Sequence, residues 1–137
     1  MSSRPTTLQV ANILFVDDDR DVADSFGEIL RAEGHYVRTA NNGEDGLSML
    51  KAARLPDLVV LDVDMPILDG PAMAHRMLLH DAGEEKIPVV LVSANEALPE
   101  IAGRMGTPYF IRKTGDIGAF LELIDRAVRE HVSPSAA

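Results

Sequence analysis

Residues 58–70 read LVVLDVDMPILDG, which joins a continuous apolar run to a group of acidic side chains. Leu58 to Leu61 is the most apolar of the short runs in the chain, and a run of this length fits a β-strand buried on both faces. Such strands occur in parallel sheets whose two faces are covered by helices. The acidic residues follow directly, so carboxylates are expected at the carboxyl end of this strand.

Four further short strands are predicted, and each predicted strand is followed by a stretch of helical period. The strands are 13–16, 36–40, 89–92 and 109–111. The helices are expected from Asp19 to Glu33, from Gly43 to near Pro56, after Asp69, from near Asn95, and from Ile117 to about His131. Five strand and helix pairs imply an α/β fold, with a parallel sheet, helices on both faces and right-handed crossovers.

Capping residues and helix breakers set the predicted helix ends. Asp19 is placed as the N-cap of the first helix and Gly34 as its stop, and Asp69 can cap the third. The fourth helix is expected to be short, because Pro99 is accepted only in a first turn and glycines follow soon after it. The inward side chains of the third helix are expected to be Met73, Met77 and Leu78.

Composition restricts the chain to one soluble domain. Its 137 residues suffice for a single core, expected over 11–131, with flexible segments at 1–10 and 132–137. The net charge of -9 repels nucleic acid phosphates, and no apolar run is long enough to span a membrane. Without cysteine there is no disulfide or thiolate metal site, and the first residues lack the apolar core of a secretory signal. A cytoplasmic location is expected.

Polar residues that could carry chemistry lie at the ends of the predicted strands. In an open parallel sheet the binding crevice lies beyond the carboxyl ends of the strands. Residues 17–19 are all aspartate, Asp62 and Asp64 follow the third strand, Ser93 ends the fourth, and Lys113 follows the fifth. Carboxylates gathered in this way need raised pKa values or a bound cation, and an all-oxygen site suits Mg²⁺. Asp62 could then attack phosphorus, with Lys113 and Ser93 receiving the phosphoryl oxygens.

Taken in order, these motifs resemble a receiver domain of two-component response regulators, of the stand-alone, chemotaxis-regulator-like kind or cut from a longer protein. The resemblance covers residues 12–131. It rests on VDD at 16–18, VLDVDMPILDG at 60–70, VSA at 92–94 and Lys113 after an aromatic strand. It implies a flavodoxin-like (βα)5 fold with strand order 2-1-3-4-5.

The resemblance also implies a function for individual residues. Asp62 would accept a phosphoryl group from a phosphohistidine on a histidine kinase or histidine phosphotransfer protein, with Ser93 and Lys113 contacting that group. Phe110 would be the aromatic switch residue, acting with Ser93, and the surface read by a downstream protein would be the fourth helix, fifth strand and fifth helix. Mg²⁺ would be held by Asp17, Asp18, Asp62 and the backbone carbonyl of Asp64.

Two positions depart from the family pattern. Proline usually follows the lysine, with a cis bond between them, whereas Thr114 follows Lys113 here, and a cis bond before a non-proline residue costs about 3 kcal/mol or more. The sequence leaves the isomer open. Asp64 could face the phosphoryl group and either orient an attacking water or repel it, so the sign of its effect on phosphoryl lifetime stays open.

Other interpretations of the same residues remain. Asp62-x-Asp64 also resembles the nucleophile and acid of Mg²⁺-dependent phosphohydrolases of haloacid-dehalogenase type, although in that family the metal-binding acidic pair lies after the lysine. A degenerate receiver that binds partners without phosphorylation is a third possibility. Phe110 could be an ordinary core residue. The four histidines show no metal spacing and are expected at the surface: His35, His75, His80 and His131.

Overall fold

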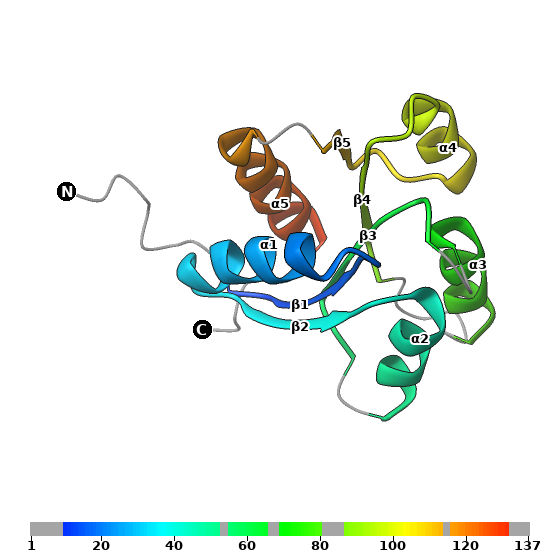
Figure 1. The fold of residues 1–137 in the computed structure, drawn as a ribbon, viewed down its shortest axis with the longest axis horizontal. Coiled ribbons are helices and arrows are strands. Elements are labelled where there is room, and N and C mark those ends of the chain that lie inside the picture. Colours follow the sequence, from blue (N-terminus) through cyan, green and yellow to red (C-terminus); the bar gives the residue numbers. More distant parts are fainter. Residues whose placement is uncertain (1–9, 53–54, 66–68, 81–86, 114–115, 132–137) are drawn as a thin grey trace.

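The computed structural model describes residues 10–52, 55–65, 69–80, 87–113 and 116–131. Five strands alternate with five helices in these ranges, as the sequence predicts (Figure 1). No helix in them is long and apolar enough to cross a membrane. Except for Val10, the segments predicted to be flexible lie outside the described residues. The elements are β1 (Asn12–Val16), α1 (Arg20–Ala32), β2 (Tyr36–Ala40), α2 (Gly43–Ala52), β3 (Leu58–Leu61), α3 (Gly70–His80), β4 (Val89–Ser93), α4 (Leu98–Met105), β5 (Phe110–Arg112) and α5 (Ile117–His131).

The strands form one parallel sheet in the order β2-β1-β3-β4-β5, which confirms the predicted flavodoxin-like topology. The register aligns the carboxyl ends of the strands at the centre of the sheet. Val16, the last residue of β1, pairs with Ala40 of β2 and with Leu61 of β3. The residues that follow β1 and β3 therefore leave the sheet side by side.

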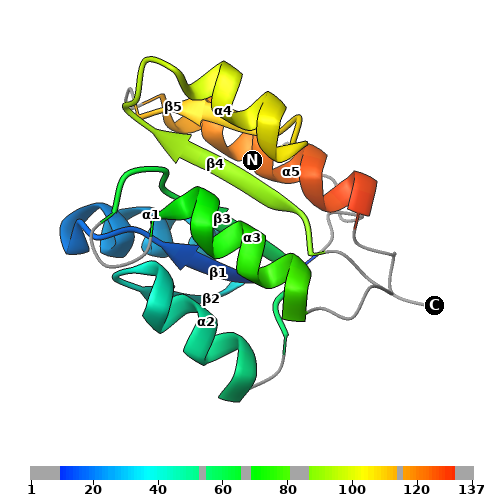
Figure 2. The ribbon, with the colours of Figure 1, turned by 90° about the vertical axis from the view of Figure 1, so that its right-hand side faces the viewer.

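Helices cover both faces of the sheet, with α1 and α5 on one side and α2, α3 and α4 on the other (Figure 2). Successive strand residues point to opposite faces. Accordingly, Ile13 and Phe15 of β1 belong to the core beneath α1 and α5, and Leu14 and Val16 belong to the core on the other face. The sheet is thus apolar on both sides, which is why its strands read as unbroken apolar runs.

The predicted ends of α1 and the short length of α4 are confirmed, although α4 begins at Leu98, three residues after the position expected. Asp19 caps α1, because its carboxylate accepts hydrogen bonds from the backbone N–H groups of Asp21 and Val22. Gly34 follows that helix with a φ of 100°, a left-handed conformation that favours glycine. Helix α4 has eight residues, with proline in its first turn and a left-handed Gly106 at its end.

Smaller expectations have mixed outcomes. Met73 of α3 is buried as predicted, whereas the side chains of Met77 and Leu78 lie outside the described part of the chain. Strand β5 begins one residue later than predicted, at Phe110. Tyr109 still lies beside β4, since its carbonyl accepts a hydrogen bond of 2.9 Å from the Leu91 N–H.

Replacement of glycine by alanine should have opposite effects at two positions. Gly34→Ala should lower the free energy of unfolding by about 1–2 kcal/mol, because alanine is strained at positive φ. Gly103→Ala, inside α4 where nothing lies within 4 Å of the added carbon, should raise it by about 0.5–1 kcal/mol. Urea denaturation of the two variants measures both effects. Destabilisation of similar size at both positions would contradict this assignment of strain to Gly34.

Candidate functional site

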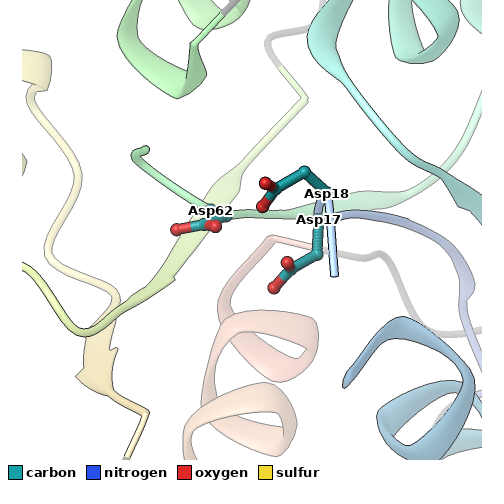
Figure 3. Close-up of side chains that lie close together, drawn as sticks. All are labelled: Asp17, Asp18 and Asp62. Atoms are coloured by element: carbon teal, nitrogen blue, oxygen red, sulfur yellow. The ribbon is translucent and has the colours of Figure 1, made fainter. Parts of the chain in front are cut away.

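Three carboxylates meet at the carboxyl ends of β1 and β3. Asp17 follows β1 and Asp62 follows β3, and the backbone N–H of Asp62 donates to the Val16 carbonyl at 3.0 Å. One oxygen from each of Asp17, Asp18 and Asp62 lies within 4.8 Å of the others (Figure 3). Asp17 is 1% exposed and Asp62 5% exposed, whereas Asp18 is exposed to solvent. The structure thus brings together the carboxylates that the sequence predicts at this edge.

Local turns orient the two buried carboxylates. In Asp17, Oδ1 accepts a hydrogen bond of 2.9 Å from the N–H of Asp19. In Asp62, Oδ1 accepts a hydrogen bond of 3.3 Å from the N–H of Asp64. The side chain of an aspartate commonly bonds the backbone two residues later in this way. Each turn uses one oxygen and leaves Oδ2 to face the lysine that approaches from β5.

Lys113 connects the two buried carboxylates. Its Nζ lies 2.7 Å from Oδ2 of Asp17 and 3.2 Å from Oδ2 of Asp62. The side chain is 22% exposed, so the ammonium group is partly shielded from solvent. Pairing of β5 with β4 holds it there, since the Lys113 N–H donates to the Ser93 carbonyl at 3.1 Å. Ser93 is itself buried, at the end of β4.

Charge and burial shift the pKa values in this cluster. Burial raises the pKa of Asp62 above its ordinary value of 3.8, Lys113 lowers it, and the charge of Asp17 raises it again, with a net upward shift. Burial lowers the pKa of Lys113, but the hydrogen bond and charge of Asp17, together with Asp62, raise it above its ordinary value overall. The lysine is therefore protonated at neutral pH, and its ammonium group pairs with two of the three carboxylates in the cluster.

Gly70 lies against the backbone that carries Asp62. Its N–H donates to the Val63 carbonyl at 3.0 Å. A Cβ at position 70 would lie 2.3 Å from the carbonyl oxygen of Asp62 and 3.1 Å from the Cα of Val63. These contacts involve backbone atoms that cannot turn aside, so only glycine fits. The sequence suggests a turn at Gly70, but it contains no sign of this contact.

Phe110 lies apart from the buried cores. It is 38% exposed on β5, so the interpretation of this residue as an ordinary core side chain is wrong. Its role as a switch stays a prediction. Thr114 lies outside the described residues. The cis or trans state of the peptide bond between Lys113 and Thr114 therefore lies outside them too.

One of the four histidines contradicts the expectation that all lie at the surface. His35 is 5% exposed, and its Nδ1 accepts a hydrogen bond of 3.1 Å from the N–H of Ala11. This backbone bond satisfies a polar group that would otherwise exclude the ring from the interior. His75 and His131 are exposed as predicted, and the side chain of His80 is not among those described.

Two polar residues beside the site have contacts that no sequence motif signals. Asn95 donates from Nδ2 to the carboxylate of Asp64, at 3.0 Å from Oδ2. Arg112 bonds the carbonyls of Asn95 and Glu96, at 3.4 Å and 3.2 Å. Both residues are polar and neither belongs to the motifs quoted above, so only the folded arrangement shows that they connect the loops after β3 and β4 with β5.

Residues 13–125 match the response regulator receiver domain family. The chain is 36% identical over 93 residues to the transcriptional regulatory protein AfsQ1 of Streptomyces coelicolor, covering 67% of this chain and 39% of that protein. It is 33% identical over 118 residues to protein PilH of Pseudomonas aeruginosa, covering 85% and 96%. The crystal structure of NtrX from Brucella abortus superposes with a TM-score of 0.78 at 32% identity, covering 90% of this chain and 28% of NtrX.

The chain therefore belongs to the response regulator receiver domain family, whose members are signalling domains of two-component systems. The matched range contains every residue of the acidic cluster and its lysine. The chain spans 39% of AfsQ1 and 45% of a response regulator receiver protein from Anaeromyxobacter, so it spans less than half the length of these curated relatives.

Asp62→Asn should stabilise the protein at neutral pH. A carboxyl group with a raised pKa stabilises the fold when protonated, below its ordinary value of 3.8, and this contribution is lost as the pH rises through the folded pKa. Asparagine does not titrate, so the difference in unfolding free energy between variant and parent should increase from pH 4 to pH 7 in metal-free buffer. Urea denaturation at several pH values measures it.

Asp24→Asn, at an exposed position on α1, is the matched control for the loss of one carboxylate and should change the unfolding free energy by less than about 0.5 kcal/mol. A gain for Asp62→Asn that is the same at pH 4 and pH 7 would mean that burial and Asp17 do not disfavour the ionised form.

Proposed function

We propose that Asp62 accepts a phosphoryl group from a phosphohistidine on a histidine kinase or histidine phosphotransfer protein. The arrangement around the buried Asp62 carboxylate carries the proposal. Lys113 lies 3.2 Å from it, and the carboxylates of Asp17 and Asp18 lie within the same 4.8 Å cluster. A carboxylate nucleophile beside a fixed cation, with further oxygen ligands for a metal ion, is suited to phosphoryl transfer.

The transfer exchanges one bond to phosphorus for another. A carboxylate oxygen of Asp62 attacks the phosphorus, the phosphorus–nitrogen bond of the phosphohistidine breaks, and the leaving imidazole nitrogen takes up a proton. The product is an aspartyl phosphate. Lys113 and the hydroxyl of Ser93 donate hydrogen bonds to the phosphoryl oxygens, where fixed donors stabilise the charge that builds up during transfer.

The acidic cluster has the chemistry of a Mg²⁺ site, with Asp17, Asp18, Asp62 and the backbone carbonyl of Asp64 as the residues that would hold the ion. All of these donors are oxygen, and Asp18 is exposed, which suits an ion that keeps several waters. Bound Mg²⁺ would supply positive charge that offsets both the carboxylates and the incoming phosphoryl group. The single ammonium group of Lys113 cannot balance three carboxylates alone.

The output of the domain is proposed to be a changed surface on α4, β5 and α5 that a downstream protein reads. A phosphoryl group on Asp62 adds charge and strong hydrogen-bond acceptors next to Ser93. When Ser93 moves toward these acceptors, it vacates space near β5. Phe110 is 38% exposed, and its ring removes apolar surface from water by turning into that space.

A phosphohydrolase of haloacid-dehalogenase type is the alternative function, and the site supports it less well. Its general acid would be Asp64, but the Asp64 side chain is exposed and accepts a hydrogen bond from Asn95. The acidic pair at Asp17 and Asp18 also precedes Asp62 in the chain, unlike the order in that family. We infer a phosphoacceptor for signalling, whose own chemistry is limited to self-phosphorylation from small donors and autodephosphorylation.

Acetyl phosphate with Mg²⁺ should add one phosphoryl group per chain, stable in acid and labile in base. Asp62→Asn should abolish this labelling because it removes the nucleophilic oxygen, and the exposed Asp24→Asn should label as the parent does. Intact mass spectrometry measures the added mass. Labelling of Asp62→Asn would overturn the acceptor assignment, and sustained multiple-turnover release of phosphate from a small phosphomonoester would favour the phosphohydrolase.

Mg²⁺ affinity should depend on the exposed carboxylate of Asp18. Asp18→Asn should weaken binding at least about tenfold, or ~1.4 kcal/mol, because it removes one charged oxygen ligand and leaves the Lys113 contacts in place. The chain has no tryptophan, so NMR shifts near Asp17 and Asp62 during a Mg²⁺ titration are the measurement. Equal affinity in parent and variant would exclude Asp18 as a ligand, and Asp24→Asn controls for loss of one surface charge.

A further inference from the structure

Asn95, two residues after Ser93, uses every hydrogen-bonding group that it has. Its N–H donates to Oγ of Ser93 at 3.1 Å, and its carbonyl accepts from the Leu98 N–H at 3.1 Å. Its side-chain Oδ1 accepts from the Ala97 N–H at 2.8 Å, and Nδ2 donates to the Asp64 carboxylate at 3.0 Å. One residue thus connects the end of β4, the loop after β3 and the start of α4.

Strand β5 reaches the same residue through Arg112. Nη1 of Arg112 lies 3.4 Å from the Asn95 carbonyl, and Nη2 lies 3.2 Å from the carbonyl of Glu96. A planar guanidinium group that bonds two consecutive carbonyls fixes the direction of the backbone between them. Arg112 lies immediately before Lys113, so the segment of β5 that carries the site lysine also holds the loop between β4 and α4.

We propose that Asn95 is the positioning residue that couples phosphorylation of Asp62 to the surface formed by α4 and β5. The inference rests on the proposed function and deepens it. Asn95 does not touch the acceptor carboxylate; it acts through Ser93 and through Asp64.

Movement at Ser93 can reach Asn95 through the hydrogen bond that joins them. When the Ser93 hydroxyl turns toward a phosphoryl oxygen, the Asn95 N–H that is bonded to Oγ follows it or loses its partner. If Asn95 follows, its bonds to Asp64 and Arg112 cannot keep their present lengths unless β5 and the loop after β3 move too. Its carbonyl and Oδ1 hold the first N–H groups of α4, so the start of that helix is displaced with it.

Asparagine suits this position better than aspartate or alanine would. Its amide carries an acceptor for Ala97 and a donor for Asp64 on one rigid plane. Aspartate would keep the acceptor and face a second carboxylate, and alanine would lose both contacts. The bonds to Asp64 and Arg112 are exposed, and exposed hydrogen bonds contribute little net stability, so they can rearrange without unfolding the domain. Leu98, fully buried, keeps α4 attached to the core meanwhile.

The test compares the response of α4 and β5 at equal phosphorylation. Parent and variants are treated with saturating acetyl phosphate and Mg²⁺, occupancy is measured by mass spectrometry, and phosphorylation-induced amide shifts of α4 and β5 are measured by NMR. Asn95→Ala should reduce these shifts at least about twofold at equal occupancy, because it removes the side-chain bonds to Asp64 and Ala97 and leaves only the backbone bonds of residue 95 to transmit the movement. Arg104→Ala, exposed on α4 outside this network, should respond as the parent does.

Exchange of donor and acceptor provides the sharper result. Asn95→Asp places two carboxylates face to face and should reduce the α4 response, whereas the double variant Asp64→Asn/Asn95→Asp restores a donor opposite an acceptor and should recover it. A response equal to the parent's in Asn95→Ala, or no recovery in the double variant, would overturn the coupling role. Absence of labelling in the parent would instead overturn the proposed function, and this inference with it.

Discussion

The contact of one ammonium group with two buried carboxylates is the constraint on which the rest of the site depends. Asp17 and Asp62 would repel each other at the end of adjacent strands, and both have lost most of their contact with water. Lys113 offsets that repulsion only because β5 pairs with β4 and ends beside Ser93. The strand order places β1 beside β3 and β5 two strands from β3. It therefore determines which charged side chains meet at this edge of the sheet. Without the pairing of β5 with β4, Lys113 would lose the backbone bond to Ser93 that holds it beside the carboxylates.

The two sides of the site are held in place by different kinds of contact. On the side of β1 and β3, the backbone fixes the acidic groups through short turns and through the close approach of Gly70. On the side of β4 and β5, exposed side-chain hydrogen bonds around Asn95 hold the loops. The buried carboxylates are thus placed rigidly, whereas the loops beside them are held by exposed hydrogen bonds that water can replace.

Much of the fold follows from the sequence, because its signals are local. Asp19 and Gly34 predict the ends of α1. The strands are unbroken apolar runs because both of their faces are buried, and this pattern predicts a parallel sheet. The carboxylates and Lys113 could be placed at one edge because strand ends converge. The bond of the Ala11 N–H to His35 and the bond of Asn95 to Asp64 could not be predicted, since each joins residues far apart in the sequence that belong together only in the folded chain.

The close fit of Gly70 against the carbonyl of Asp62 also bears on how the domain can change over time. Every amino acid other than glycine has a Cβ, and at this position that atom would lie 2.3 Å from the carbonyl oxygen of Asp62. Substitution at this position is therefore strongly constrained, and the constraint comes from the main chain of Asp62 and Val63. In a saturation mutagenesis survey Gly70 should therefore tolerate few replacements, because any other residue has to displace the main chain that carries Asp62.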